Sequence, residues 1–507
     1  MTANHIVIKT HKTKPDLFKK VMLWILLAAG VIGAAYTLSL IVRFASSPNQ
    51  MDFGEGFSTY IAQLWANGQF HWQPDIEPYM TLIYGTIYPT LMAPFVHLFG
   101  PDLRIGRVFS ILATAVIAFL IYLIAKRYTK NRFIPFIAAL LPFTYSGYQE
   151  WIMQTRCDMT AIMFETIGLY LAIRFWNQGK KVLWCIPFIL LAFFTKQSEI
   201  SVGIAIGIAL LISNRQIFMR YLSITVGSLS LIILIGNLLT GGQFWKQLTT
   251  YNVTTPFFNY VGSQTLVWFM IIFPLIFLFI MAAAYVVKKF QARELNLPVI
   301  WVTVAVVLNS FAICRFAGFV NYAMEMVIAM GLVTALYFDT KISQRVLISG
   351  LLVFQLLLAY SFYESGTHFI IMPDKGYQER INKVQSIIQD AQYPILTEHA
   401  GLMLNAGKVP YYEPFIYTQL IYKGYFPEDK IVSDLQNQKI EYIVLQSPGT
   451  YPPRQKYGHL TLKMMDEIKE NYTIVYNTYD EKVKNQFWYS FTVYEANDKL
   501  RSASLGR

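Results

Sequence analysis

The chain has few charged residues and very few cysteines for its length. Of its 507 residues, 14% are charged and 55% are hydrophobic, whereas soluble domains average roughly 25% and 45–50%. Disordered and collagen-like proteins are excluded by the apolar share, and a disulfide scaffold is excluded because the three cysteines are far apart. Since the mean hydropathy is +0.39, the composition indicates a membrane protein.

Several catalytic motifs are also missing. The sequence has no P-loop, no G-x-G-x-x-G, no H-E-x-x-H, no Cys-x-x-Cys and no G-x-S-x-G, so the enzyme classes that these motifs mark do not compete. The formal charge of +12 does not indicate nucleic-acid binding, which needs a basic face on a soluble domain. In a membrane protein the distribution of that charge matters more than its sum.

Apolar stretches long enough to cross a bilayer recur along the first 362 residues. The first, about 21–45, is too long for a signal-peptide core, and we expect it to remain as an anchor. The others lie near 106–125, 133–150, 158–176, 182–195, 199–213, 217–240, 264–287, 298–314, 320–338 and 344–362. We therefore predict a polytopic α-helical membrane protein with about 11 transmembrane helices.

The positions of Lys and Arg give the expected orientation. With the N-terminus inside, the inner segments carry 19 of these residues, the outer segments carry 7, and the other 16 follow the last span. Since cytoplasmic loops are enriched in Lys and Arg, residues 1–20 are expected in the cytoplasm and the C-terminus outside. We expect a multi-pass protein of the cell membrane, which in a bacterium is the plasma or inner membrane.

Two outer segments are long enough to carry structure of their own. Residues 46–105 separate the first two spans, and an apolar face predicts a helix at 53–66 that lies along the membrane surface. Residues 363–507 alternate helical patterns with β-rich runs, which predicts a soluble extracytoplasmic α/β domain. The helical patterns lie at 377–391, 427–437 and 460–470, and the β-rich runs lie at 393–397, 440–445, 472–476 and 487–494. The predicted domains are thus the N-terminal tail 1–20, a transmembrane domain 21–362 and the C-terminal domain 363–507.

Two carboxylates, Asp52 and Glu55, stand just after the first span in the sequence Met51-Asp-Phe-Gly-Glu-Gly56. One interpretation is structural, because Asp52 can cap the helix at 53–66 and Glu55 can complete a capping box. The other is catalytic, because a carboxylate at the mouth of a helix bundle can act as a general base. The pattern itself leaves both interpretations open.

Further polar groups are predicted on the same side of the membrane, where ionisable residues often mark a functional site. Lys and Arg can hold a phosphate there, and developing charge on a leaving phosphate requires stabilisation. The implied substrate is a membrane lipid with a phosphorylated head. The candidates are Asp75, Tyr84, Arg156, Asp158, Lys196, Arg315, Asn321 and Tyr322.

The order of several short motifs resembles the GT-C glycosyltransferases, most closely the branch with the protein mannosyltransferases and the lipid A aminoarabinose transferases. The similarity covers most of residues 20–340. It is carried by Asp52-Phe-Gly-Glu-Gly56, Gln63-Leu-Trp-Ala-Asn-Gly68, Pro78-Tyr79, Tyr88-Pro89, Leu98-Phe-Gly-Pro-Asp102, Lys126-Arg127, Arg156-Cys-Asp158, Thr195-Lys-Gln197 and Arg315-x-x-Gly318-x-x-Asn321-Tyr322.

The resemblance implies a GT-C-like fold and an inverting transferase whose donor is a polyprenyl-phosphate-linked sugar. In this family an acidic residue of the first outer loop acts as the base. Asp52 matches it, with Glu55 as its neighbour and substitute, although the family's tandem Asp-Glu is split here by two residues. Lys196 and Arg315 match positions suited to the donor phosphate.

The resemblance also bears on the rest of the site and on cofactors. Asp158 matches a second acidic position, which shapes the site or a metal site in some members. The remaining candidate substrate-binding residues are Asp75, Tyr84, Arg156, Asn321 and Tyr322. No cofactor is assigned and a divalent metal stays open, because metal use differs across the superfamily. The acceptor, whether protein, lipid or cell-envelope glycan, and the transferred sugar stay open too.

Two other classes of function compete with the transferase. A transporter or flippase of lipid-linked saccharides would also gather polar groups among many spans, but it predicts paired broken helices at the midplane, and no such pairing is seen. A non-catalytic membrane protein whose C-terminal domain binds a partner is the third class.

Overall fold

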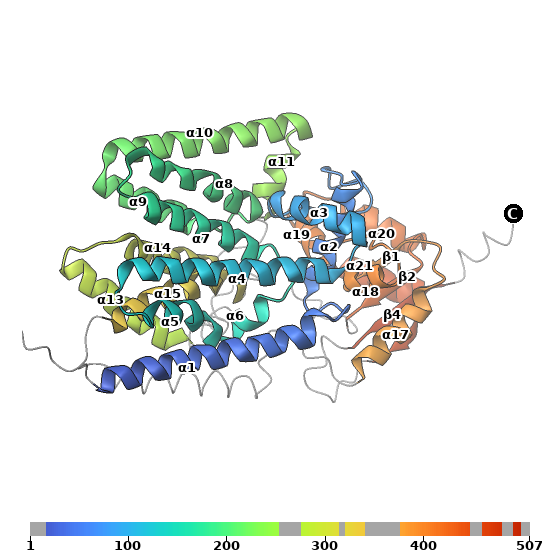
Figure 1. The fold of residues 1–507 in the computed structure, drawn as a ribbon. Coiled ribbons are helices and arrows are strands. Elements are labelled where there is room, and N and C mark those ends of the chain that lie inside the picture. Colours follow the sequence, from blue (N-terminus) through green and yellow to red (C-terminus); the bar gives the residue numbers. More distant parts are fainter. Residues whose placement is uncertain are drawn as a thin grey trace, which may run out of the picture.

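The computed structural model describes residues 17–252, 275–313, 320–339, 376–446, 459–478 and 490–497. A bundle of long, roughly aligned helices forms one part of the molecule and a small α/β domain packs against one end of it (Figure 1). The polar segment between the first two long helices lies at the junction of these two parts. The predicted helical fold with a C-terminal sheet is confirmed at this level, whereas the number of spans stays a prediction.

The bundle begins with α1, Leu17–Leu40, which continues as a π-helical turn, Ile41–Ala45. Two helices of the outer segment and one long helix follow: α2 Phe53–Ala66, α3 Ile87–Phe99 and α4 Leu103–Tyr128. The remaining helices of this part are α5 Ile134–Leu140, α6 Ser146–Trp151, α7 Asp158–Phe175, α8 Ile186–Thr195, α9 Ser201–Ser213, α10 Arg215–Thr240, α11 Gln243–Trp245, α13 Ile276–Gln291, α14 Leu297–Ile313 and α15 Met324–Phe338.

Two predicted spans differ in detail from the structure. The apolar stretch 133–150 is not one helix, because a 3-10 turn at Leu141–Thr144 separates α5 from α6. Pro142 lies in this turn, and proline cannot donate the hydrogen bond that would continue a helix through it. The stretch 182–195 begins with a 3-10 segment, Gly179–Cys185, before α8. The predicted span 344–362 lies outside the described residues.

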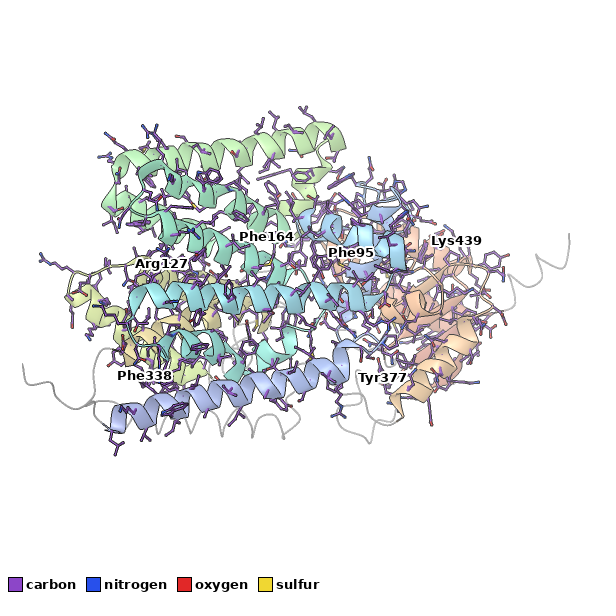
Figure 2. All side chains as sticks on the ribbon, viewed as in Figure 1. Phe95, Arg127, Phe164, Phe338, Tyr377 and Lys439 are labelled. Carbon is purple, nitrogen blue, oxygen red and sulfur yellow. The ribbon has the colours of Figure 1, made fainter. Side chains whose placement is uncertain are left out.

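Lipid-facing character is clearest in α10, whose only buried residue is Tyr221. Long apolar side chains along it, including Leu231, Leu234 and Leu238, are exposed, and Figure 2 shows side chains that project from α10 on the side away from the other helices. A helix in water would hide such side chains, so this surface suits contact with lipid. Four helical segments of the described residues are long and apolar enough to span a membrane: Leu23–Ala45, Leu103–Tyr128, Arg215–Thr240 and Val320–Phe338.

The C-terminal domain contains a four-stranded sheet in the order β1-β2-β4-β3. The strands are β1 Ile395–Thr397, β2 Tyr442–Leu445, β3 Tyr472–Asn477 and β4 Thr492–Ala496; β1 and β2 are parallel, and the other pairs are antiparallel. The helices are α17 Tyr377–Ile388, α18 Ala400–Asn405, α19 Pro414–Tyr422, α20 Glu428–Gln436 and α21 Leu462–Asn471. The sequence predicted all four strands and three of these helices.

The segment 46–105, which the sequence predicts to be the first outer segment, is hydrogen-bonded to this domain. Tyr79 N–H donates to the Tyr411 carbonyl at 3.0 Å, and Glu413 N–H donates to the Tyr79 carbonyl at 3.1 Å. Where α2 meets α18, a Cβ on Gly56 would lie 2.1 Å from the Gly401 nitrogen, so only glycine allows this approach. The outer segment and the C-terminal domain therefore build one end of the molecule together.

The prediction for the apolar face of α2 was half right. The helix covers 53–66 as predicted, and Asn67 is its C-cap. Its face does not lie on a membrane surface, however, because Phe57, Tyr60 and Leu64 are buried in a cluster with Ala400 and Leu404 of α18. The periodicity marked a buried face correctly, but it could not tell lipid from a distant part of the same chain.

Candidate active site

Asp52 is the N-cap of α2, and its side chain also takes part in an ion pair. Its Oδ2 accepts a hydrogen bond from Gly54 N–H at 2.9 Å and pairs with Arg156 Nη2. The two side chains are 19% and 21% exposed, so the pair is accessible. Burial raises the pKa of Asp52 above its usual range, although the Arg156 charge opposes this shift. A carboxylate with a raised pKa is suited to accept a proton near neutral pH.

Gly54 makes room for this ion pair. A Cβ at position 54 would lie 2.1 Å from Arg156 Nη1, so any side chain there displaces the guanidinium. The capping interpretation of Asp52 is correct, and it leaves the catalytic interpretation open, because one carboxylate can cap a helix and also accept a proton.

Glu55 lies in a closed environment. Arg107 Nε and Nη2 each donate to it at 2.9 Å, and Met51 N–H and Thr155 N–H donate at 2.7 and 2.8 Å. The Glu55 and Arg107 side chains are 0% exposed. Burial alone would raise the pKa of Glu55, but the Arg107 charge and these hydrogen bonds lower it below its usual range. A carboxylate held in this way is a poor proton acceptor.

A second group of predicted residues forms a buried cluster. Lys196 Nζ lies 2.8 Å from Asp158 Oδ1 and 2.9 Å from Glu199 Oε1. Asn321 Nδ2 donates to Asp158 Oδ1 at 2.9 Å, and the ring of Tyr322 lies 4.4 Å from Lys196 Nζ. The fold thus brings together four of the predicted residues from three distant segments, although Lys196 is only 1% exposed.

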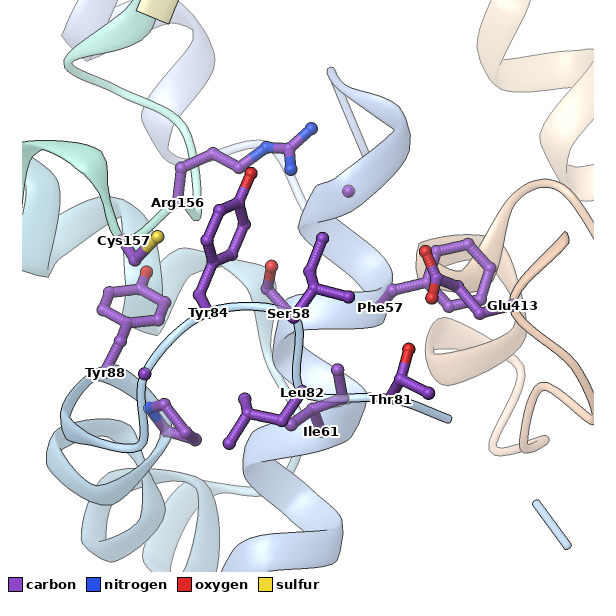
Figure 3. Close-up of a pocket in the computed structure, with 14 residues that line it drawn as sticks. Phe57, Ser58, Ile61, Thr81, Leu82, Tyr84, Tyr88, Arg156, Cys157 and Glu413 are labelled. Carbon is purple, nitrogen blue, oxygen red and sulfur yellow. The ribbon is translucent and has the colours of Figure 1, made fainter. Parts of the chain in front are cut away.

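A pocket lies beside the Asp52–Arg156 pair, with about 600 Å³ of empty space, part of it open to solvent. Figure 3 shows Tyr84 pointing toward the Arg156 guanidinium on one side and Glu413 on the opposite side. Its walls come from α2, from residues 81–89, from the segment before α7 and from the C-terminal domain. Tyr84 and Arg156 were predicted from the sequence, whereas Glu413 was not.

One predicted residue does not join this site in the structure, and another cannot be placed. Asp75 is exposed, does not line the pocket, and contacts Lys430 of the C-terminal domain through its backbone carbonyl at 2.6 Å. Arg315 lies outside the described residues. Arg107 was missed as a partner of Glu55, although a lone arginine at the start of the predicted span 106–125 is a signal that could have found it.

Three buried glutamates lie beside Lys196. Glu165, Glu199 and Glu325 each offer a carboxylate oxygen, and these oxygens lie within 4.8 Å of one another. The oxygens of Glu325 already accept from Trp301, Ser201 and Asn309.

This donor set fits a divalent metal poorly. Glu199 is held by the Lys196 ammonium, and Glu165 Oε2 is a buried oxygen that has no hydrogen-bond partner among the described residues. One free oxygen next to a buried ammonium is a weak cation site, because metals of this class need several oxygen ligands.

Two proteins with solved structures share this fold at low sequence identity. ArnT from Cupriavidus metallidurans, bound to undecaprenyl phosphate, is 11% identical with a TM-score of 0.58, over 93% of this chain and 98% of that chain. The oligosaccharyltransferase AglB from Archaeoglobus fulgidus, with an inhibitory peptide and a dolichol-phosphate, is 12% identical with a TM-score of 0.55, over 95% and 75%. The fold is therefore that of the GT-C class, as the resemblance predicted.

The sequence itself adds a family match. Residues 86–239 match the family described as dolichyl-phosphate-mannose-protein mannosyltransferase. This stretch includes α4, α7, Arg156 and Lys196, so it covers the helices that carry much of the site. A comparison with curated protein sequences finds no significant match. The fold and this partial family match both point to the GT-C glycosyltransferases as the proteins that this chain resembles.

Proposed function

We propose that the protein transfers a sugar from a polyprenyl-phosphate donor to an acceptor at the outer face of the membrane, with inversion at the anomeric carbon. The observation that carries this proposal is the Asp52–Arg156 pair beside a pocket at the junction of the bundle and the C-terminal domain. The solved ArnT and AglB structures hold undecaprenyl phosphate and dolichol-phosphate, which supports a donor of this class. The acceptor is a protein, a lipid or a cell-envelope glycan.

In the proposed reaction Asp52 is the general base. It takes the proton of the acceptor hydroxyl while the acceptor oxygen bonds to the anomeric carbon. The bond from that carbon to the phosphate oxygen breaks, and the polyprenyl phosphate leaves as an anion. Asp52 is favoured over Glu55 because it is accessible and its pKa is raised, whereas Glu55 is buried with Arg107 and its pKa is lowered.

For the donor phosphate we propose Arg156 as the main ligand. It lines the pocket, it is partly exposed, and a guanidinium binds phosphate oxygens in a bidentate way. Lys196, which the sequence argument favoured, has two carboxylates within 2.9 Å and contacts a phosphate only by leaving one of them. We propose that Lys196 instead holds Asp158 and Glu199 in place behind the pocket. Arg315 stays a proposed phosphate ligand from the sequence argument.

The first experiment measures the thermal stability of the detergent-purified protein with undecaprenyl phosphate and with its sugar conjugates. A ligand that binds only the folded protein raises its apparent melting temperature with concentration. We expect a shift for the wild type and a much smaller one for Arg156→Ala. No shift with any of these lipids would contradict a lipid-phosphate donor and favour a transporter of another cargo or a partner-binding protein.

The second experiment measures sugar transfer from the donor that gives the largest shift. We expect Asp52→Asn to lower the rate by about 10²–10⁴-fold, the usual contribution of a general base, while the protein still folds and binds the donor. Because Asn also caps helix N-termini, α2 should stay intact in this variant. Wild-type activity in Asp52→Asn would refute this assignment.

A further inference from the structure

Glu413 is a buried carboxyl that the proposed reaction leaves without a role. It precedes α19 in the C-terminal domain and is 7% exposed, yet it lines the pocket beside the Asp52–Arg156 pair. Within the part of the chain that the structure describes, no hydrogen-bond partner of its carboxyl is found. Buried polar groups are normally paired, so an unpaired carboxyl in a pocket suggests that a ligand completes its hydrogen bonds.

The backbone holds Glu413 at this position. Its N–H donates to the Tyr79 carbonyl at 3.1 Å, its carbonyl accepts from Tyr417 N–H at 3.2 Å, and the residue before it forms a parallel bridge with Tyr79. The chain that leaves Tyr79 then forms the pocket wall at 81–89. Glu413 is therefore placed by the same contacts that join the outer segment to the C-terminal domain, and not by a loop of its own.

Two other polar groups in the pocket wall also lack hydrogen-bond partners among the described residues. Thr81 is 2% exposed, and its hydroxyl has no partner among the described residues. Arg156 Nε, on the other side of the pocket, has none either. Between these polar groups lie the apolar side chains of Phe57, Ile61 and Leu82 (Figure 3).

We propose that Glu413 and Thr81 bind the hydroxyl groups of the sugar that the donor carries, so that the C-terminal domain supplies part of the sugar site. A sugar presents hydroxyls in several directions around a less polar ring, which matches polar groups on opposite sides of an apolar wall. A polyprenyl chain has no hydroxyls to offer, and a phosphate alone fits the Arg156 side only. This inference rests on the proposed function.

The protonation state of Glu413 suits this role. Burial raises its pKa to about 8, with the Arg156 charge acting in the opposite direction. The other titratable groups that it influences are Tyr412 and Tyr417, both uncharged near neutral pH. Glu413 is then a neutral acid that both donates and accepts a hydrogen bond, as a sugar hydroxyl does.

The test compares two probes on the purified full-length protein: undecaprenyl phosphate and undecaprenyl phosphate that carries a sugar. We expect Glu413→Ala to weaken binding of the sugar-bearing lipid about tenfold, the value of one buried hydrogen bond, and to leave undecaprenyl phosphate unchanged. Glu413→Gln keeps a neutral donor and acceptor of similar size, so it should retain most of the affinity. Glu470→Gln, an exposed carboxyl of the same domain, is the matched control.

Thr81→Val provides an independent variant with nearly unchanged shape, in case Glu413→Ala fails to fold. It should weaken the sugar-bearing lipid and spare the bare lipid. Equal affinities of wild type and both variants for the sugar-bearing lipid would overturn the inference, as would equal losses for the two probes. If the wild type binds neither probe, the proposed function itself fails, and the inference fails with it. If the wild type binds the probes and the variants do not differ as expected, the inference alone fails.

Discussion

Replacing Glu55 with Gln should destabilise the fold rather than remove a catalytic group. Glu55 and Arg107 are both fully buried, and two N–H groups of Arg107 donate to the carboxylate at 2.9 Å. The neutral amide leaves the guanidinium charge without a partner, and breaking a buried ion pair in this way costs about 3–5 kcal/mol. For a chain of 507 residues the unfolding entropy makes 1 kcal/mol worth ~1 °C, so the apparent melting temperature should fall by about 3–5 °C.

The companion variant Arg107→Met should cost at least as much. Arg107 also donates to the backbone carbonyls of Phe44, Ser47 and Asn49, at 3.2, 2.5 and 2.6 Å. Removing it leaves these three acceptors and the Glu55 carboxylate unsatisfied, and each buried unsatisfied group has its own cost. The stretch that connects α1 to α2 should therefore become the first part of the molecule that proteases cut.

The assay is thermal unfolding of the purified variants, with donor binding and transfer rate measured below the transition. Asp102→Asn is the control, because its pair with Arg104 is 27% and 53% exposed, Asn keeps the cap of α4, and such surface pairs contribute about 0–1 kcal/mol. A Glu55→Gln protein that melts like the wild type but no longer transfers sugar would refute the reasoning and make Glu55 the base.

Two further predictions concern the outer segment and the C-terminal domain. Gly54→Ala should lower the transfer rate and donor affinity while the protein still folds, because the added Cβ would lie 2.1 Å from Arg156 Nη1; unchanged kinetics would contradict the need for this space. His399 is buried and its pKa is lowered to about 4 by burial, so the stability that it contributes above pH 6.5 is lost as the pH falls toward 4, by about 3 kcal/mol. His399→Asn, which can still cap α18, should make the domain less acid-sensitive by limited proteolysis at pH 7 and 5; an equal loss of protection would refute this.

Much of the fold could be predicted because short local sequence patterns mark many of its helices and strands. The helix at 53–66 follows from its apolar period and its caps, and the strands and three helices of the C-terminal domain follow from alternating and amphipathic patterns. The break at Leu141–Thr144 was hidden inside a continuous apolar run. Hydropathy alone does not separate one long helix from two short ones, although Pro142 was the residue that marked the break.

The part of the candidate site that could be predicted is the part whose residues the predicted membrane topology places on the same side. Asp158, Lys196 and Asn321 follow or precede predicted spans on one side of the membrane, and the structure places them in contact. Glu413 could not be found in this way, because it is more than 300 residues from Thr81 and Tyr79 and no local pattern distinguishes it from a surface glutamate. Its role depends on how two parts of the chain dock, which a single sequence does not encode in any short window.

The spacing within Asp52-Phe-Gly-Glu-Gly56 explains why two nearby carboxylates differ so much. As the N-cap, Asp52 keeps extended backbone and projects its carboxylate toward Arg156, while Glu55 reaches back to the Met51 N–H and meets Arg107 inside the protein. The two glycines make room for different neighbours: Gly54 lies against the Arg156 guanidinium, and Gly56 lies against α18. A tandem pair of acids could not occupy the N-cap and the third helical position together. The spacing of two residues between the carboxylates therefore places one of them in the protein interior and the other beside the pocket, which is why the Asp52 and Glu55 variants should fail in different assays.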